Sequence, residues 1–205
     1  MIAAVITAID VQEMEFRIRY CGSARELPDI AAGLAELGEA AIPLIPALVE
    51  KCPAQLDWSL RRQLLPLYEA TRSPVLGRYL LRNRKELGVQ DKCRLFDAGL
   101  AGLEEDLLGA LHERWHNLRD AANIVVRAEI VETLGRHGSE QALRMLEVIR
   151  SRLSGEFGEW AAKVRMSGAA TEDPVFLSEN LDAWTNATFL ETVQEAVAAL
   201  GRRVA

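Results

Sequence analysis

Apolar residues recur at intervals of three and four positions along most of this 205-residue chain, which is the period of an amphipathic α-helix. One helix is predicted over residues 57–70, with Asp57 as its N-cap, and the next over 73–87, with Ser73 as its N-cap. Gly88 indicates a stop for the second helix. Leu and Ala dominate, which favours helices packed through aliphatic side chains over β-sandwiches. The chain is therefore predicted to be all-α.

The clearest pair of helices is predicted within residues 121–153. The first helix ends at Gly135, and Ser139 caps the second after a turn of about three residues. The apolar positions at helical spacing are Ile124, Val125, Ala128, Val131 and Leu134 in the first helix, and Ala142, Leu143, Leu146, Ile149 and Leu153 in the second. Two amphipathic helices joined by so short a turn lie antiparallel. Asp91 and the acidic run 104–106 indicate the starts of two further helices.

Such helix pairs are expected to repeat, because one pair cannot bury its own apolar face. Helix ends with related sequence are predicted at Leu37-Gly38, Ala70, Leu103, Leu134-Gly135 and Leu200-Gly201. The first four lie 33, 33 and 31 residues apart, and the last lies 66 residues further on, which equals two units. This spacing predicts about five or six stacked helix pairs.

One unit carries a more specific signature. Residues 125–135 read Val-Val-Arg-Ala-Glu-Ile-Val-Glu-Thr-Leu-Gly, and Gly138-Ser139 and Ala142-Leu143 follow. This unit resembles a HEAT repeat of the short bacterial kind, in which the first helix carries Val-Arg, Ala and a final Leu-Gly. Residues 33–51 resemble the second half of the pattern, and the resemblance covers residues 27–153. It implies a right-handed α-α superhelix of antiparallel helix pairs, as in HEAT and armadillo solenoids.

Two regions depart from the repeat. Residues 10–20 alternate apolar and charged side chains, so both a helix and a strand fit, and we favour the helix. Residues 154–186 contain several glycines and the run Thr-Glu-Asp-Pro, which predicts an irregular connection before a C-terminal helix over 187–203. The expected organisation is a single helical-repeat domain over residues 1–205.

The composition narrows the function classes. The net charge of −6 argues against a surface devoted entirely to nucleic acid, and three cysteines without a Cys-x-x-Cys pair give no disulfide framework or zinc site. The apolar start of the chain is short and lacks the basic flank of a secretory signal. We therefore expect a soluble cytoplasmic protein that neither spans nor binds a membrane.

His112-Glu113-Arg114-Trp115-His116 matches the zinc-binding pattern His-Glu-x-x-His, which places two imidazoles on one helical face. Zinc peptidases with this pattern usually carry uncharged residues in its middle, whereas Arg114 stands there. A third ligand, Glu129 or Glu132, is suggested only by proximity in sequence. The interpretation that we favour is an exposed helix face carrying a buried tryptophan. No catalytic residue, metal or cofactor is therefore predicted, with His112 and His116 kept as the metal candidates.

Charge is distributed unevenly. Residues 58–94 hold nine basic residues, Arg61, Arg62, Arg72, Arg78, Arg82, Arg84, Lys85, Lys92 and Arg94, against Glu69, Glu86 and Asp91. Arg78, Arg82 and Lys85 are spaced to share one helical face, and Arg61 and Arg62 precede them. This pattern predicts a surface for anions or for an acidic partner, and a merely solvated face is the alternative.

The predicted function is a non-enzymatic scaffold or adaptor that binds a protein partner, with an additional oligomeric contact left open at its exposed end repeats. Trp58 and Trp115 are expected to pack between helices. Asp182 beside Trp184 invites comparison with the HEAT-like alkylpurine DNA glycosylases, so a DNA-binding or glycosylase-like protein is the alternative. A zinc hydrolase built on His112 and His116 is a more remote one.

Overall fold

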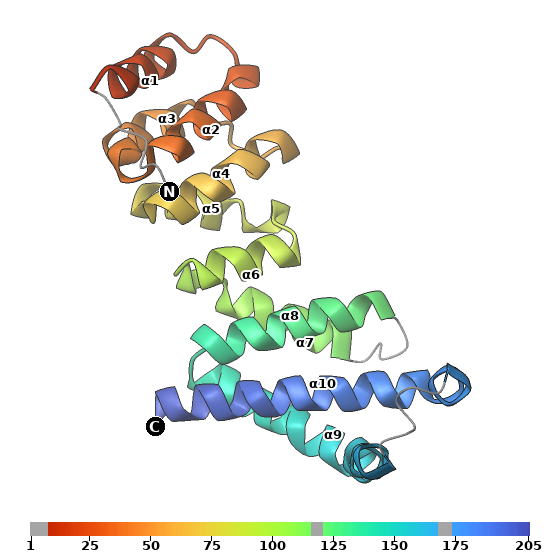
Figure 1. Ribbon diagram of the computed structural model, residues 1–205. Helices are drawn as coiled ribbons and strands as arrows, with labels where there is room; N and C mark the ends of the chain where they lie inside the picture. The colour runs from red at the N-terminus through yellow and green to blue at the C-terminus, as the bar shows by residue number, and fades with distance from the viewer. Residues whose placement is uncertain (1–7, 116–120, 168–173) are drawn as a thin grey trace. The chain divides into compact units, whose positions relative to one another are not determined.

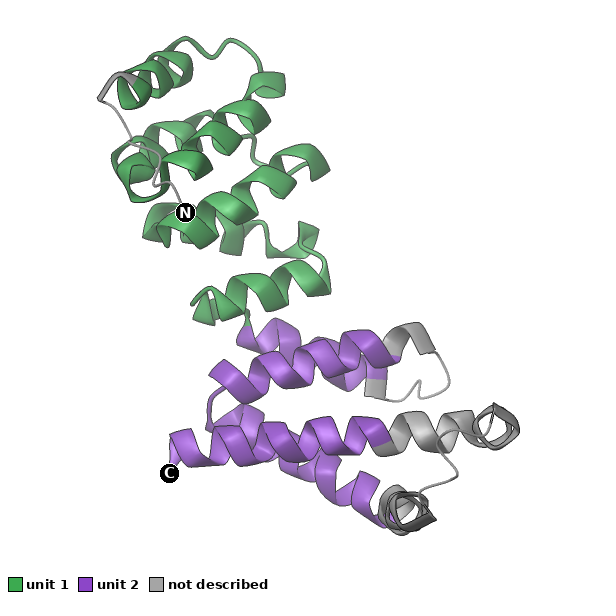
Figure 2. Cartoon of the chain, viewed as in Figure 1, with its two compact units in different colours: residues 1–103 green, residues 104–205 purple. Residues whose placement is uncertain are grey.

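The computed structural model describes residues 8–115, 121–167 and 174–205. Within these residues every regular element is a helix and there is no strand, so the predicted all-α class is confirmed (Figure 1). A single domain over residues 1–205 was predicted, whereas the chain divides into two compact units, residues 1–103 and residues 104–205 (Figure 2). Each unit has its own buried apolar side chains and is described separately.

Unit 1, residues 1–103, is a two-layered stack of helices. Its elements are α1 (Ala8–Tyr20), η1 (Ala24–Glu26), α2 (Leu27–Leu37), η2 (Gly38–Leu44), α3 (Ile45–Lys51), α4 (Trp58–Thr71), α5 (Pro74–Arg82), η3 (Arg84–Glu86), α6 (Val89–Asp97) and η4 (Ala101–Leu103). In one layer α2 packs on α4 and α4 on α6, and in the other α1 packs on α3 and α3 on α5. The core between the layers is mainly aliphatic, with buried Leu27, Ile30, Leu34, Ile45, Leu48, Leu60, Leu64, Leu67, Leu76 and Leu80.

Residues 10–20 lie in helix α1, as favoured, and not in a strand. Met14 and Ile18, four residues apart, are buried against the rest of unit 1. Phe16 and Tyr20, also four apart, are exposed on the other side of the helix. The alternation in the sequence therefore reflects two apolar rows on one helix, only one of which is buried.

The start of α4 follows the predicted capping. The Asp57 carboxylate accepts a hydrogen bond from the Leu60 backbone N–H at 2.8 Å and satisfies one of the unpaired donors of the first turn. At the other end Arg72, in the left-handed region with φ +50°, donates its backbone N–H to the Tyr68 carbonyl. Ser73 then precedes Pro74, the first residue of α5, as predicted, although its hydroxyl makes no capping bond.

Helix α5 ends at Arg82, five residues before the predicted end at Leu87. The buried Asn83 amide donates to the Tyr79 carbonyl at 3.0 Å, and the same carbonyl accepts the Asn83 backbone N–H at 3.2 Å, so the side chain adds a second bond at the end of the helix. Gly88 has a different role from the predicted one, because it is the N-cap of α6. Its N–H donates to the Asp91 carboxylate at 3.2 Å. Asp91, in the first turn of α6, therefore stabilises the start of this helix.

Among the described residues, the helical run Ala24–Lys51 is long and apolar enough to cross a membrane by length and composition alone. This run includes α2 and α3, and Gly38, with φ +57°, ends α2 and redirects the chain between them. The large apolar side chains of both helices, including Leu34 and Ile45, are buried within unit 1. The run therefore supplies core helices of this unit.

Unit 2, residues 104–205, contains α7 (Glu104–Trp115), α8 (Ala121–His137), α9 (Glu140–Ser167) and α10 (Pro174–Val204). The acidic run 104–106 forms the first turn of α7, as predicted. Helix α10 packs against both α8 and α9. Phe189, Val193, Ala196 and Leu200 of α10 are buried in this packing.

The predicted irregular connection over residues 154–186 is largely wrong. Helix α9 continues to Ser167, and the last helix begins at Pro174 instead of at residue 187. Residues 168–173 lie outside the described residues. A glycine inside a helix costs only about 1 kcal/mol relative to alanine, so the glycines between 154 and 167 do not have to end one. Pro174 occupies the first helical position, where its missing N–H does no harm.

The Leu-Gly pairs are not equivalent helix ends. Gly38 ends α2, but Gly135 lies inside α8, which continues to His137, and Gly201 lies inside α10. A Cβ on Gly135 would meet the Ala196 Cβ at 2.7 Å and its Cα at 2.8 Å. Glycine at 135 therefore permits the close approach of α10, and a motif predicted to mark a turn instead marks a helix crossing.

Candidate functional site

The exposed sides of α1, α3 and α5 form one face of unit 1, which we call the α1–α3–α5 face. These three helices make up one layer of the stack, and their buried sides point into the core that they share with α2 and α4. In such a two-layered arrangement the outer sides of the layers point in opposite directions. Residues on the outside of α5 therefore lie on the opposite face from residues on the outside of α4.

A pocket of about 320 Å³ opens on this face between α1 and α3. Ile18, Leu44 and Ala47 give it an apolar lining, and Ile18 and Leu44 also belong to the core. Its charged lining is formed by Glu15 and Arg19 of α1 and by Glu50 and Lys51 of α3. An apolar cavity with a few charged groups at its edge is typical of a site that receives an apolar side chain and orients it by polar contacts.

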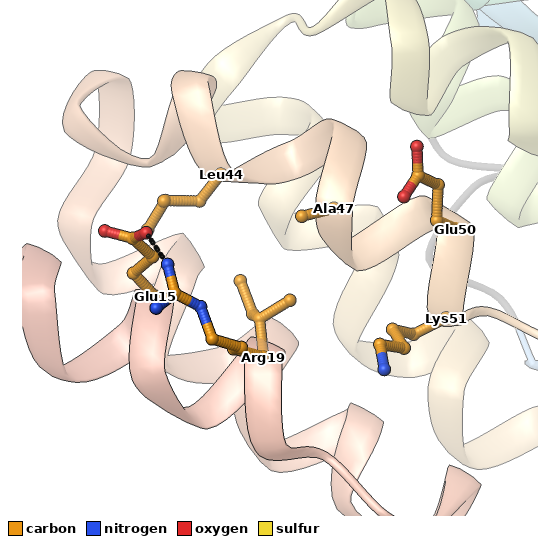
Figure 3. Close-up of a pocket in the computed structure, with 7 residues that line it drawn as sticks. Glu15, Arg19, Leu44, Ala47, Glu50 and Lys51 are labelled. Carbon is orange, nitrogen blue, oxygen red and sulfur yellow. Dashed lines mark hydrogen bonds and ion pairs between the residues drawn. The ribbon is translucent and has the colours of Figure 1, made fainter.

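The two sides of this pocket differ in how their charges are paired. On α1 the Arg19 guanidinium and the Glu15 carboxylate form an ion pair at 2.7 Å, shown by the dashed line in Figure 3. On α3, across the pocket, Glu50 and Lys51 form no ion pair with any residue that the structure describes. The α3 side therefore keeps one anion and one cation available to a ligand.

Arg78 and Arg82 extend the face onto α5. They lie one helical turn apart, both are exposed, and neither has an ion-pair partner in the described part of the chain. The Tyr79 hydroxyl donates to the Pro53 carbonyl at 2.8 Å, which holds the last turn of α5 beside the segment that follows α3. The two arginines are thus attached to the same layer as Glu50 and Lys51.

The remaining predicted basic residues do not share one helical face. Lys85 is exposed in η3, beyond the end of α5, so its predicted alignment with Arg78 and Arg82 on a continuous helix is wrong. Arg61 donates to the Glu86 carbonyl, and its Nε lies 3.4 Å from the Asp91 carboxylate. Arg61 therefore joins α4 to η3 and α6, and its charge is already compensated.

Arg62 and Trp58 lie on the outside of α4, on the face opposite to Arg78 and Arg82. The Arg62 guanidinium carbon is 5.5 Å from the Trp58 ring centroid, within the range of a cation–π contact. Trp58 is 63% exposed, so the predicted role for it in helix packing is wrong. Hydrophobic spacing could not have shown this, because Trp58 is the first residue of its helix and starts no apolar row.

The histidine pattern yields no metal site on the part of the chain that is described. His112 and Glu113 are exposed on α7, and His116 lies outside the described residues. No group of three or more His, Cys, Asp or Glu side chains among the described residues could hold a metal ion. The side chains of Trp115, Trp160, Asp182 and Trp184 also lie outside them, so the comparison with DNA glycosylases rests on sequence alone.

Two titratable side chains behind the α1–α3–α5 face, Cys52 and Tyr79, stay protonated at neutral pH. Burial, with a smaller contribution from nearby Cys21, raises the pKa of the Cys52 thiol to about 12. Burial also raises the pKa of Tyr79, and Cys52 and Asp57 add to this effect. Both groups are therefore neutral, and they support the end of α3 without presenting a nucleophile.

The pocket was not predicted, because it depends on how α1 packs against α3 and has no local sequence signal. No family model matches the chain, and neither the curated proteins nor the solved structures contain a match.

Proposed function

We propose that the helix pairs of this chain are HEAT-type repeats that follow one another in a right-handed α-α superhelix. The first helices of successive pairs, α2, α4, α6 and α8, begin at Leu27, Trp58, Val89 and Ala121, at intervals of 31, 31 and 32 residues. Within unit 1 the equivalent helices of neighbouring pairs pack on each other, α2 on α4 and α3 on α5. Nearest-neighbour packing at a fixed period is typical of helical repeat proteins.

We further propose that the chain is a non-enzymatic adaptor whose α1–α3–α5 face binds an acidic amphipathic segment of a protein partner. The observation that carries this proposal is an apolar pocket on the same face as Arg78 and Arg82, two arginines that have no ion-pair partner among the described residues. An apolar side chain of the partner enters the pocket, and carboxylates that follow it along the chain meet the arginines. Affinity then comes from the anchor, and the charges add orientation and a faster association.

Nucleic acid is the alternative ligand. It is disfavoured because several of the basic side chains already form ion pairs. Arg61 is compensated by Asp91, and Arg94 forms a bidentate pair with Glu69 at 3.0 and 3.1 Å. Tight binding to a nucleic acid backbone depends on many phosphate contacts, whereas a short acidic segment needs only a few.

Fluorescence anisotropy with two labelled probes tests this proposal. One probe is an amphipathic helical peptide of leucine, alanine and glutamate, and the other is a DNA duplex. We expect the peptide to bind at physiological salt with a Kd on the order of 10 µM, and DNA to bind only at low salt. Ala47→Phe fills the pocket and should weaken peptide binding, whereas Ala70→Phe on the exposed side of α4 should not.

Three results decide the matter. Peptide binding that is lost in Ala47→Phe and kept in Ala70→Phe supports the proposal. Failure of the peptide to bind contradicts it. DNA binding that survives physiological salt would indicate that the ligand is nucleic acid and not an acidic protein segment.

A further inference from the structure

The outer side of α1 carries an apolar row that nothing in the proposed function uses. Phe16 and Tyr20 are 61% and 65% exposed, and their ring centroids are 4.4 Å apart. They lie opposite Met14 and Ile18, which are buried, so the row points directly away from unit 1. Large aromatic side chains exposed side by side are typical of a contact surface.

Charged residues flank this row on both sides in the same order. At 100° per residue, Glu13 and Arg17 lie along one side of Phe16, and Glu15 and Arg19 lie along the other. On each side the glutamate precedes the arginine by one helical turn. The first half of the helix is therefore acidic and the second half basic.

This pattern is complementary to itself in an antiparallel arrangement. If two copies of α1 pack about a two-fold axis that passes near Phe16, the Phe16 rings meet at the axis. Glu13 then faces the second copy's Arg17 on one side, and Glu15 faces the second copy's Arg19 on the other. A two-fold contact uses the same patch on both subunits, so a patch whose charges reverse along its length suits it.

We propose that α1 is a self-association surface, occupied by α1 of a second copy of this chain in an antiparallel, two-fold contact. The ion pair between Glu15 and Arg19 within one helix becomes part of a four-charge cluster in the dimer. One helix crossing buries less than the ~1,000 Å² expected of a stable interface, so the dimer is weak, with a Kd on the order of 100 µM.

Sedimentation equilibrium of the full chain over a range of concentrations around this value tests the proposal. The wild-type chain should self-associate, and Phe16→Ser/Tyr20→Ser should remain monomeric. Trp58→Ser is the matched control, because Trp58 is 63% exposed but lies on α4, and it should associate like wild type.

A charge exchange adds a test that does not remove the aromatic row. Glu13→Lys/Glu15→Lys makes the flanks of α1 basic throughout, and Arg17→Glu/Arg19→Glu makes them acidic throughout. Each variant alone places like charges across the two-fold axis and should be monomeric, whereas an equimolar mixture should form a heterodimer. Circular dichroism checks that the variants stay helical.

A wild-type chain that is monomeric at every concentration overturns the proposal. Association that is unchanged in Phe16→Ser/Tyr20→Ser, or a mixture that associates no better than its components, overturns it as well. Phe16→Ser/Tyr20→Ser alters neither the pocket lining nor Arg78, so its loss of self-association leaves the peptide-binding test of the adaptor function independent. The charge-exchange variants change Glu15 and Arg19, which line the pocket, and are therefore used only in the sedimentation test.

Discussion

The guanidinium carbon of Arg127 on α8 lies 5.2 Å from the ring centroid of Phe189 on α10, and the two side chains are 0% and 2% exposed. A fully buried arginine is uncommon, because a cation loses its hydration on burial and must be compensated inside the protein. The aromatic face supplies part of that compensation. Arg127 is also the arginine of the Val-Arg pair on which the HEAT resemblance rests.

This contact predicts a measurable coupling between the two residues. Phe189→Leu keeps an apolar side chain but removes the ring, and Arg127→Met keeps much of the volume but removes the charge. We expect a double-mutant cycle on the free energy of unfolding in urea to give a coupling of about 1–2 kcal/mol. Additivity of the two single changes to within ~0.3 kcal/mol would show that the ring does not stabilise the cation.

Gly135 should resist substitution although alanine is the better helix former. In Gly135→Ala the new Cβ would lie 2.7 Å from the Ala196 Cβ and 2.8 Å from its Cα, so α10 must move away. We expect a net loss of about 1–3 kcal/mol in the free energy of unfolding, because overpacking outweighs the gain in helix propensity. Gly109→Ala in α7, where a Cβ meets nothing within 4 Å, is the control and should stabilise the protein slightly. Equal effects of the two substitutions would argue against the close helix crossing.

The cap of α4 gives a prediction within unit 1. Asp57→Ala removes the hydrogen bond from the Leu60 N–H and should lower the free energy of unfolding by about 1 kcal/mol. Ser73→Ala, at the N-cap of α5, removes a hydroxyl that makes no capping bond and should cost less. Urea titration compares the two variants, and a larger loss for Ser73→Ala would contradict this account of the caps.

The Cys52 thiol should make stability depend on alkaline pH. Its pKa is raised from 9.0 to about 12 in the folded chain, mainly by burial, so the unfolded chain ionises first as the pH rises. The thiol's contribution to stability is therefore complete below pH 9 and is lost between about pH 9 and pH 12. Cys52→Ala should show a smaller fall in the urea midpoint between pH 8 and pH 10.5 than wild type, and an identical fall would refute the burial effect.

Local signals in the sequence predicted local structure well. Asp57, the Ser73-Pro74 step and the acidic start of α7 act through their own neighbours, and each begins its helix as expected. Signals that depend on tertiary packing were misleading. The glycines after residue 154 were predicted to end a helix. Instead α9 continues through them to Ser167 and packs against α10.

Periodicity also misjudged which sides of the helices are buried. Val125 was placed in the apolar row of α8, yet it is 65% exposed while Arg127, two residues on, is fully buried. Trp58 is likewise exposed. Of the five predicted basic residues, Arg78 and Arg82 share the α1–α3–α5 face, while Arg62 lies on the opposite one. Hydrophobicity identifies candidates for burial, but the register of each helix against its neighbours selects among them.

The most direct test of the account compares two double charge reversals in the peptide anisotropy assay. Arg78→Glu/Arg82→Glu alters the proposed face, whereas Arg62→Glu/Arg202→Glu alters exposed arginines elsewhere, and both pairs change the net charge from −6 to −10. We expect the first pair to weaken binding of the acidic peptide at least about tenfold and the second to change it less than about twofold. Equal weakening by both pairs would show that the peptide responds only to overall charge, and would contradict a binding site on the α1–α3–α5 face.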